Sequence, residues 1–550
     1  PERGTGRRRG RGKRGSMSVI TGEIGAPATA ERASGKGLKV GALGMVSSLV
    51  IGVASTAPAY SLAATLGFVT YYVGVQAPAV MLLAFLPMLF IAAAYYYLNH
   101  ADPDCGTTFT WVTRAMGPKT GWMAGWGILV TDLVVMPNLS QIAGSYTFSL
   151  FGAHGIAANQ SGFWVTFVGV LWIVVMTAIC YIGIELSART QVALLGAEIL
   201  ILVIFSVVAL AKVYAGGVAH GVHPSLQWLN PLKIPTVGAL SAAMLLAVFI
   251  YWGWDTAVTV NEEAKDVRRT PGRAALWSTL VLLAVYVVVS FASQAFHGAG
   301  YLTNHSDDVL GALSRGVLGS PWDKLLIIAV LTSASASTQT TILPAARSSL
   351  SMAVHKAFPK RFGDIHPRYL SPAFSTLVFG AVSVAWYVAL TLISPGDVLA
   401  NSIEALGFGI AFYYGLTGFA CVFYYRRHIF KSVKNFIFIG LAPLLGGVIL
   451  AVLFVVAIFY YSDPANSSSG TQAWFPGIHF SFHIFHWHIY VKKGLGPPVV
   501  LGLGLLIIGI PVMLVWRLRH RDFFNRHREV AAAVDSVAPP LTPGVIPLTD

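Results

Sequence analysis

Long apolar runs separated by short polar segments occupy almost the whole chain. A helix needs about 20 predominantly apolar residues to cross the hydrocarbon core of a bilayer. Twelve stretches approach or exceed that length: 42–66, 75–98, 120–150, 162–183, 191–214, 236–260, 274–297, 322–346, 372–393, 398–425, 436–461 and 497–517. The pattern therefore predicts an all-α polytopic membrane protein with twelve transmembrane helices. The third stretch is long, so we expect its helix to be tilted or to extend beyond the bilayer.

The composition supports a membrane protein. Of 550 residues, 55% are hydrophobic and 11% are charged, whereas soluble domains carry about 25% charged residues. This composition excludes a disordered chain and argues against a soluble enzyme. The three cysteines, Cys105, Cys180 and Cys421, form no CxxC pair, which excludes a disulfide scaffold.

The distribution of basic residues gives an orientation. Twelve crossings put both termini on one side of the membrane. Only six of the 37 Lys and Arg residues then fall on the opposite side: Lys212, Lys233, Arg315, Lys324, Lys492 and Lys493. Cytoplasmic loops carry an excess of Lys and Arg. We therefore expect both termini inside the cell, a location in the cytoplasmic (plasma) membrane, and a net charge of +14 that reflects orientation and not nucleic-acid binding.

The chain divides into a membrane domain and two tails. Residues 1–40 form a basic cytoplasmic tail that we expect to be disordered, because Arg/Gly runs without aromatic residues seldom fold. Within it, residues 1–16 read as an extension or tag remnant, with a basic arm on anionic lipid as the alternative. The twelve-helix domain covers 41–518, and 519–550 form a second cytoplasmic tail.

Two of the twelve stretches carry interruptions. The first contains Pro58 after Ser55 and Thr56, and a proline removes a helix N–H and clashes with the preceding turn. The sixth contains Gly253 between two tryptophans. Membrane helices tolerate an isolated proline, but interruptions at matching positions of two halves indicate a transporter binding site. Their separation by five stretches predicts an inverted repeat, 41–215 and 236–425, with two extra helices in 436–517.

Three segments together resemble the amino acid–polyamine–organocation superfamily of transporters. The first is Tyr251-Trp252-Gly253-Trp254-Asp255 with 261–266 and Thr270-Pro271-Gly272-Arg273, which looks like the sixth helix and its following loop. The second is 346–353 with 358–363 and 366–369, similar to the loop between the eighth and ninth helices. The third is 106–109 with 116–118 and 121–126, similar to the connection between the second and third helices. Each motif is weak alone, but three in order are strong, and the resemblance covers roughly 40–520.

The resemblance implies a LeuT-type fold of five plus five helices. It also implies a secondary transporter, not an enzyme, that moves amino acids or related organic amines by alternating access, with a proton as the coupling ion and no cofactor. The expected partners are a small-molecule substrate and the bilayer. The implied substrate site lies at the two breaks, with the carboxylate at N–H groups of the first and the amine at carbonyls of the second. Its residues are Val53, Ala54, Ser55, Thr56, Phe249, Tyr251, Trp252, Gly253, Trp254 and Asp255.

Two departures from the family pattern matter. The first break reads Gly52-Val53-Ala54-Ser55-Thr56 where the family has a Gly-Ser-Gly-Ile-Phe-like segment, so side-chain contacts do not transfer there. An apolar, His-rich stretch from His479 to Val491 looks inserted before the last helix. Its histidines 479, 483, 486 and 488 raise the question of zinc, but no Cys or acid is near in sequence, and we predict an interfacial aromatic-rich loop and no metal.

Four acids fall inside the apolar stretches: Asp132, Glu198, Asp255 and Glu404. A charge at bilayer depth costs at least about 2.5–3.5 kcal/mol, so such groups are functional candidates, or are paired or protonated. Asp255 is expected to face the substrate amine or a structural partner, and Asp132 to line the substrate path. Glu198 is the candidate for proton coupling, with a purely structural hydrogen bond as the alternative. Glu404 lies near the outer end of its stretch, where a gate or solvent contact fits better.

Several alternatives stay open at this stage. Trp252 and Trp254 are two apart and so lie on different helix faces, which makes one a gate candidate and the other core or lipid-facing. Sodium is the alternative coupling ion, with hydroxyls of Ser333, Ser335, Ser337 and Thr338 as oxygen ligands or merely as packing groups. A polyamine carrier or substrate exchanger, and a non-transporting nutrient sensor, are the alternative functions. No Walker, GxSxG or HExxH motif supports a membrane-bound enzyme.

Overall fold

The computed structural model describes residues 35–394, 398–463, 466–467, 480–484, 487–491 and 495–525. The helices of the first half are α1 (Met45–Ser55), α2 (Pro58–Val73), α3 (Ala77–Ala101), α4 (Thr108–Met116), α5 (Pro118–Leu150), α6 (His154–Ala158), α7 (Phe163–Ile182) and α8 (Ile184–Tyr214). Those that follow are α9 (Val237–Ile250), α10 (Thr256–Thr259), α11 (Thr270–Asn304), α12 (Val309–Leu318), α13 (Asp323–Val354), α14 (Ala373–Ile393), α15 (Val398–Tyr424), α16 (Val433–Asn435), α17 (Ala442–Tyr460), α18 (Pro497–Arg519) and α19 (Arg521–Asn525).

The shorter elements connect these helices. Six are 3₁₀ turns: η1 (Gly74–Gln76), η2 (Leu226–Leu229), η3 (Pro231–Lys233), η4 (Asn261–Glu263), η5 (Lys360–Gly363) and η6 (Ile429–Lys431). A π-helical segment, η7 (Phe436–Leu441), precedes α17. Strands β1 (Phe480–Ile484) and β2 (Trp487–Val491) form an antiparallel hairpin with His483 opposite His488. The predicted loop there is thus a hairpin in its described part, and His479 and His486 lie outside the described residues.

The all-α polytopic class is confirmed, but the count of twelve is not reproduced. Ten helical runs among the described residues are long and apolar enough to cross a membrane. The difference arises at the first two stretches and at the sixth. Residues Met45–Ala101 count as one continuous run, and α9 is only 14 residues long. Each predicted stretch nevertheless coincides with helix, the largest shift being at α13, which ends at Val354 and not at 346.

The outer helices present apolar side chains and the central helices bury polar ones. Leu171 on α7, Val203 on α8 and Val452 on α17 are each more than half exposed. In contrast, α5 and α13 are buried along most of their length, and α13 carries many Ser and Thr residues. This inverted arrangement fits a bundle surrounded by lipid, because the polar groups must find partners inside the protein.

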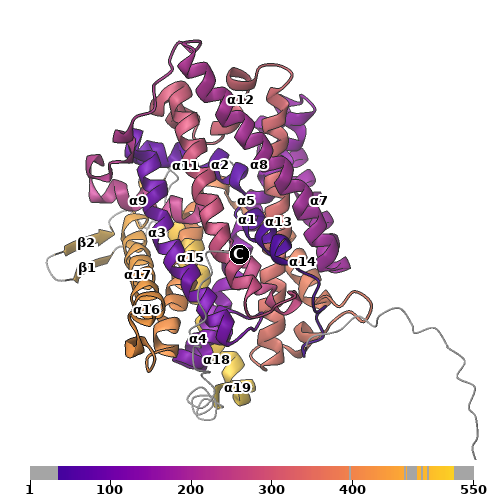
Figure 1. The fold of residues 1–550 in the computed structure, drawn as a ribbon. Helices are drawn as coiled ribbons and strands as arrows, with labels where there is room; N and C mark the ends of the chain where they lie inside the picture. The colour runs from indigo at the N-terminus through magenta and orange to yellow at the C-terminus, as the bar shows by residue number, and fades with distance from the viewer. Residues whose placement is uncertain are drawn as a thin grey trace, which may run out of the picture.

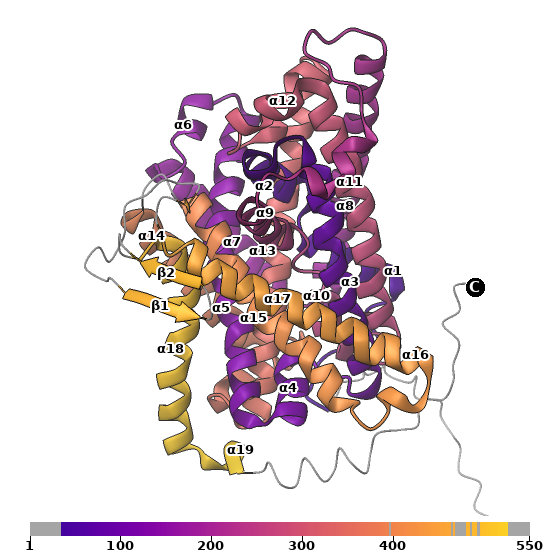
Figure 2. The ribbon, with the colours of Figure 1, turned by 90° about the vertical axis from the view of Figure 1, so that its left-hand side faces the viewer.

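The charged loops gather at one end of the bundle, called here the basic end, where Figures 1 and 2 place α4 and α19, with α12 at the other end. Lys36 contacts Asp104 and Glu262 there, and Lys356 pairs with Asp522 at 3.3 Å. The first and last described residues therefore lie at the same end.

Residues 35–44, called here the N-terminal strap, lie along the basic end. Leu38 is buried beside Cys105 and Leu350, and Leu43 forms a parallel β-bridge with Ala264. The strap begins inside the tail that the sequence predicted to be disordered through residue 40. Residues 35–40 depart from that prediction because their side chains find partners on loops distant in sequence.

Candidate functional site

The first break separates α1 from α2 at Thr56 and Ala57. Ala57 has φ 47°, in the left-handed region, and Pro58 opens α2 without an N–H group. The N–H groups of Thr56 and Ala57 donate to the carbonyls of Val53 and Ala54, each at 3.1 Å. The break is therefore a single tight turn whose own N–H groups are occupied.

The second break separates α9 from α10 and spans Tyr251 to Asp255. Gly253 has φ +121°, and a Cβ built there would lie 2.7 Å from the carbonyl oxygen of Ser55. Glycine is thus required both by the backbone conformation and by the approach of the other break. The hydroxyls of Ser55 and Thr256 lie 2.9 Å apart. The two interruptions, about 200 positions apart in sequence, are in direct contact.

Helix α13 forms the third wall of this meeting point. The Ser337 hydroxyl donates to the Ser55 carbonyl at 2.9 Å, and the Thr256 hydroxyl donates to the Thr340 carbonyl at 3.4 Å. The Thr338 hydroxyl donates within its own helix to Ala334 at 2.8 Å. Of the hydroxyls considered above as sodium ligands, Ser337 therefore holds the first break and Thr338 bonds within its own helix, whereas the Ser335 Oγ has no hydrogen-bond partner among the described residues.

Glu198 on α8 lies at the start of α2. Its Oε1 accepts from the N–H of Ala59 at 2.7 Å and from the hydroxyl of Ser333 at 2.8 Å. The N–H of Tyr60 donates to the same Ser333 oxygen at 3.2 Å. The first N–H groups of a helix lack partners within it and carry a partial positive charge. A fully buried carboxylate therefore caps the half-helix that follows the first break, and its Oε2 has no hydrogen-bond partner among the described residues.

Asp255 ends the second break and is held by hydroxyls. Tyr414 donates to its Oδ1 at 2.8 Å and Tyr413 donates to its Oδ2 at 3.2 Å. The indole N–H of Trp252 donates in turn to the Tyr413 oxygen. Asp132 on α5 lies within electrostatic reach of Asp255, and its buried Oδ2 has no partner among the described residues.

The two tryptophans of the second break differ in their surroundings. Trp254 is fully buried and packs on the rings of Tyr95 and Tyr414, with centroids 5.1 and 5.2 Å away. Trp252 is 6% exposed and is linked to Tyr413. Trp254 is therefore the core member of the pair, and Trp252 remains the gate candidate.

The remaining site candidates are all buried. They are Val53, Ala54, Ser55, Thr56, Phe249, Tyr251 and Gly253. The ring of Phe249 meets Tyr60 edge-on at 6.4 Å, whereas Tyr251 packs against Tyr286 on α11 at 5.0 Å. These residues are therefore enclosed by the surrounding helices in this structure.

Comparison with known proteins identifies the family. Residues 40–482 match the amino acid permease family. The chain belongs to this family. An uncharacterized transporter of Mycobacterium tuberculosis is 28% identical over 340 residues, covering 60% of this chain and 70% of that protein. A low-affinity putrescine importer of Escherichia coli is 22% identical over 417 residues, 75% and 88% of the two chains. A serine/threonine exchanger of Bacillus subtilis is 23% identical over 360 residues, 64% and 76%.

Family membership confirms several predictions. The permease is a multi-pass membrane transporter with a small-molecule substrate, and it is not an enzyme. The three motifs quoted from the sequence, which span residues 106–369, all lie inside the matched range 40–482.

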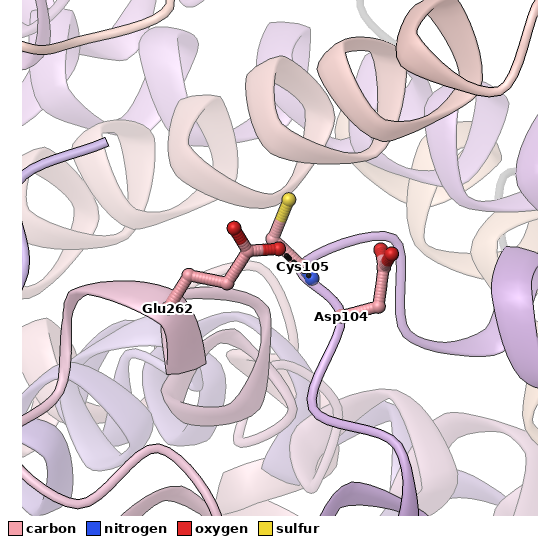
Figure 3. Close-up of side chains that lie close together, drawn as sticks. All are labelled: Asp104, Cys105 and Glu262. Atoms are coloured by element: carbon pink, nitrogen blue, oxygen red, sulfur yellow. Dashed lines mark hydrogen bonds between the residues drawn. The ribbon is translucent and has the colours of Figure 1, made fainter. Parts of the chain in front are cut away.

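At the basic end of the permease, the strap supplies a cation to an acidic cluster. Figure 3 shows Asp104, Cys105 and Glu262 lying close together, with the Cys105 N–H donating to Glu262 at 3.0 Å. Their potential ligand atoms lie within 4.8 Å of one another, close enough to hold a metal ion. The Lys36 ammonium is 2.7 Å from Asp104 and 2.6 Å from Glu262, so it takes the place of a cation there.

Acidic and basic side chains at this end stabilise one another as ion pairs. Burial alone would raise the pKa of Asp104, but the Lys36 ammonium and His355 outweigh it and hold that pKa well below its usual range. Next to it, Arg347 forms a bidentate pair with Glu263 at 2.6 and 3.0 Å, and both are almost fully buried. The Glu262-Glu263 pair therefore joins the strap, η4 and α13 in a single network.

Sequence reasoning missed the partners of the site acids. Tyr413 and Tyr414, which donate to Asp255, are adjacent on α15, and Ala59, which donates to Glu198, is the second residue of α2. The adjacent tyrosines inside an apolar stretch were a visible signal, because a buried phenol needs a hydrogen-bond partner. The sequence did not show which acid would supply it.

Proposed function

We propose that the permease is a proton-coupled secondary transporter that carries amino acids or related organic amines across the cytoplasmic membrane by alternating access. The observation that carries the proposal is the contact of the Glu198 carboxylate with the Ala59 N–H at the first break. Protonation removes the negative charge from the N-terminus of α2 and weakens its hold on the hydroxyl of Ser333. A proton bound there therefore shifts the equilibrium between two arrangements of α2, α8 and α13.

The substrate is proposed to bind where the two breaks meet. Its carboxylate would lie at Val53 to Thr56, and its amine at the carbonyls of Phe249 to Trp252 and at Asp255. The carbonyls of Phe249 and Ile250 each accept one bond, from the Trp252 N–H and the Tyr286 hydroxyl, and each keeps a second lone pair. A carboxylate held by the Thr56 N–H requires the bond to Val53 to open. Trp252 would cover the amine.

The proposed topology keeps twelve crossings. In it α1 with α2 is the first crossing and α9 with α10 the sixth, each interrupted at the binding site. The repeats are residues 41–215 and 236–425 in a LeuT-type arrangement, with two extra helices in 436–517. Both termini would lie in the cytoplasm, since the basic end carries most of the Lys and Arg residues.

Glu198→Gln in proteoliposomes tests the coupling. Glutamine mimics the protonated carboxyl permanently, so substrate binding should persist while accumulation driven by a pH gradient is lost. Asp308→Asn is the control, because Asp308 is a partly buried acid that accepts from Tyr146 and from the Gly311 N–H at the start of α12, at the other end of the bundle. Unchanged pH-driven accumulation in Glu198→Gln would make Glu198 structural. Accumulation that follows a sodium gradient would refute proton coupling.

A carrier of polyamines is the second candidate function, and Asp132 favours it. Two carboxyl groups near one binding site suit a substrate with more than one amine, and a relative is named as a putrescine importer. Asp132→Asn should then reduce putrescine uptake more than serine uptake. Equal loss of both would assign Asp132 to folding or gating.

A further inference from the structure

A cavity of about 290 Å³ lies at the basic end, away from the two breaks. It opens where α7 ends at Ile182 and α8 begins at Ile184. The other walls are Lys39 of the strap and the segment that carries Arg368 and Tyr369. The cavity thus joins three parts of the chain that are distant in sequence.

The charged side chains around this cavity are mainly positive. Lys39, Arg189 and Arg368 line it together with a single acid, Glu185. Lys39 pairs with Glu185 at 3.1 Å. Both arginines are exposed, and within the described ranges no acid forms an ion pair with either guanidinium. The lining therefore carries two positive charges in excess and two guanidinium groups with hydrogen-bond donors available to a ligand.

The backbone adds donors to the same space. Helix α8 begins here and runs for 31 residues, and no side chain caps it. The N–H groups of its first turn have no partners within the helix, and the helix end carries a partial positive charge. Donors of this kind next to arginines suit the oxygen atoms of a phosphate group.

Several contacts anchor one wall of the cavity. Ser371 donates to the Tyr181 carbonyl at 2.7 Å, and the ring of Tyr369 stacks on His366 at 4.6 Å. Gly183 has φ +131°, and a Cβ there would lie 3.3 Å from the Tyr369 carbonyl. The loop that carries Arg368 is thus tied to the end of α7.

Apolar side chains border the cavity on its outer side. Ile182 is 44% exposed and Leu186 is 39% exposed, and both belong to helices with apolar outer faces. A phospholipid can match both features: its phosphate can bind the basic lining of the cavity, and its acyl chains can cover the exposed apolar residues. We propose that the cavity binds the phosphate of an anionic phospholipid headgroup. Bound there, the lipid would tie Lys39, and with it the N-terminal strap, to the turn between α7 and α8.

Binding of phosphatidylglycerol to the purified full-length permease tests the site without a transport measurement. The probe is short-chain dihexanoyl phosphatidylglycerol, titrated by microscale thermophoresis, with dihexanoyl phosphatidylcholine and inorganic phosphate as separate competitors. Arg189→Gln/Arg368→Gln should weaken binding about 30-fold, since each surface cation near anionic lipid contributes about fivefold. Arg189→Lys/Arg368→Lys keeps the charge and should retain most of the affinity.

The matched control is Lys360→Gln/Arg361→Gln, which removes two exposed cations at the same end that do not line the cavity. It should bind the lipid as the unmodified protein does. Equal affinity in the Arg189→Gln/Arg368→Gln variant and the unmodified protein would overturn the site. If inorganic phosphate competes as effectively as phosphatidylglycerol itself, the cavity binds phosphate from any source, and the proposal of a lipid headgroup is wrong. Because no substrate is involved, failure of the proposed transport function leaves this result unaffected.

Discussion

Asp255 combines deep burial with neutral partners. Two tyrosine hydroxyls donate to its carboxylate, and among the described residues no Lys, Arg or His pairs with it. Such an arrangement leaves the charge available to a cationic ligand.

Asp255→Asn should lower substrate uptake at least tenfold while the protein stays folded, because a hydrogen bond to a charged group contributes about 1.5–3 kcal/mol. Uptake in proteoliposomes and the thermal midpoint of the purified protein are the measurements. Asp308→Asn is the control, since Asp308 also accepts from a tyrosine, Tyr146, but lies beside α12 at the other end. Normal uptake kinetics in Asp255→Asn would remove Asp255 from the substrate site.

Lys36 holds the N-terminal strap over the Cys105 thiol, whose reactivity can report on whether the strap is in place. Burial raises the pKa of the Cys105 thiol, so Cys105 stays neutral and protected while the strap is in place. Lys36 lies 3.5 Å from its sulfur.

Lys36→Gln should speed the reaction of Cys105 with N-ethylmaleimide about 5- to 30-fold, because a loss of about 1–2 kcal/mol changes an opening equilibrium by that factor. The rate is followed by mass spectrometry in a background without Cys180 and Cys421. Lys39→Gln serves as the control, because Lys39 belongs to the same strap but forms an ion pair with Glu185 at 3.1 Å. A Cys105 labelling rate that does not change in Lys36→Gln would show that the strap is held by Leu38 and its backbone bonds alone.

Among the elements, the two broken helices depend on one close approach. The second break can lie against the Ser55 carbonyl only because position 253 has no Cβ. A glycine with positive φ also occurs at Gly298 in α11, where a Cβ would have its nearest neighbour at 3.8 Å.

Gly253→Ala and Gly298→Ala therefore separate steric contact from backbone strain. Both place alanine at positive φ, which costs about 1–2 kcal/mol. Only Gly253→Ala adds overpacking, worth about 1–3 kcal/mol more. We expect a lower thermal midpoint and severe loss of uptake in Gly253→Ala, with most uptake kept in Gly298→Ala. Similar behaviour of the two variants would contradict a steric role for the contact between the breaks.

The two ends of the molecule differ in charge, and this difference predicts how the protein is oriented in the membrane. The network of Lys36, Asp104 and Glu262 and the pair of Lys356 with Asp522 assemble the basic end. The charge distribution predicts that this end faces the cytoplasm.

Cysteine labelling of intact cells tests the orientation. Positions in 462–496, such as Lys492→Cys, should react with a membrane-impermeant maleimide from outside, whereas positions in 355–368, such as Lys360→Cys, should react only after the cells are opened. The native cysteines are buried and serve as the background. The opposite labelling pattern would reverse the proposed topology.

The sequence alone determined the membrane class and the places where helices break. Apolar runs of about 20 residues have one stable environment, and Pro58 and Gly253 interrupt helices through their own covalent geometry. It also marked Asp132, Glu198 and Asp255, because a charge in an apolar run is costly wherever the run lies. The predicted number of spans differs from the observed number for two reasons. The first two stretches form one continuous run, Met45–Ala101, and the break at Gly253 leaves α9 only 14 residues long.

Tertiary structure decided which polar group meets which. The Ala59 N–H and the Glu198 carboxylate are 139 positions apart, and Asp255 and Tyr414 are 159 apart. The strap is a similar case, because Lys36 reaches Glu262 across 226 positions. Hydrogen bonds and ion pairs act over a few ångströms, so a sequence can show that a buried acid needs a partner but not which distant residue supplies it. Only the packing of α2, α8, α13 and α15 around the two breaks selected those partners.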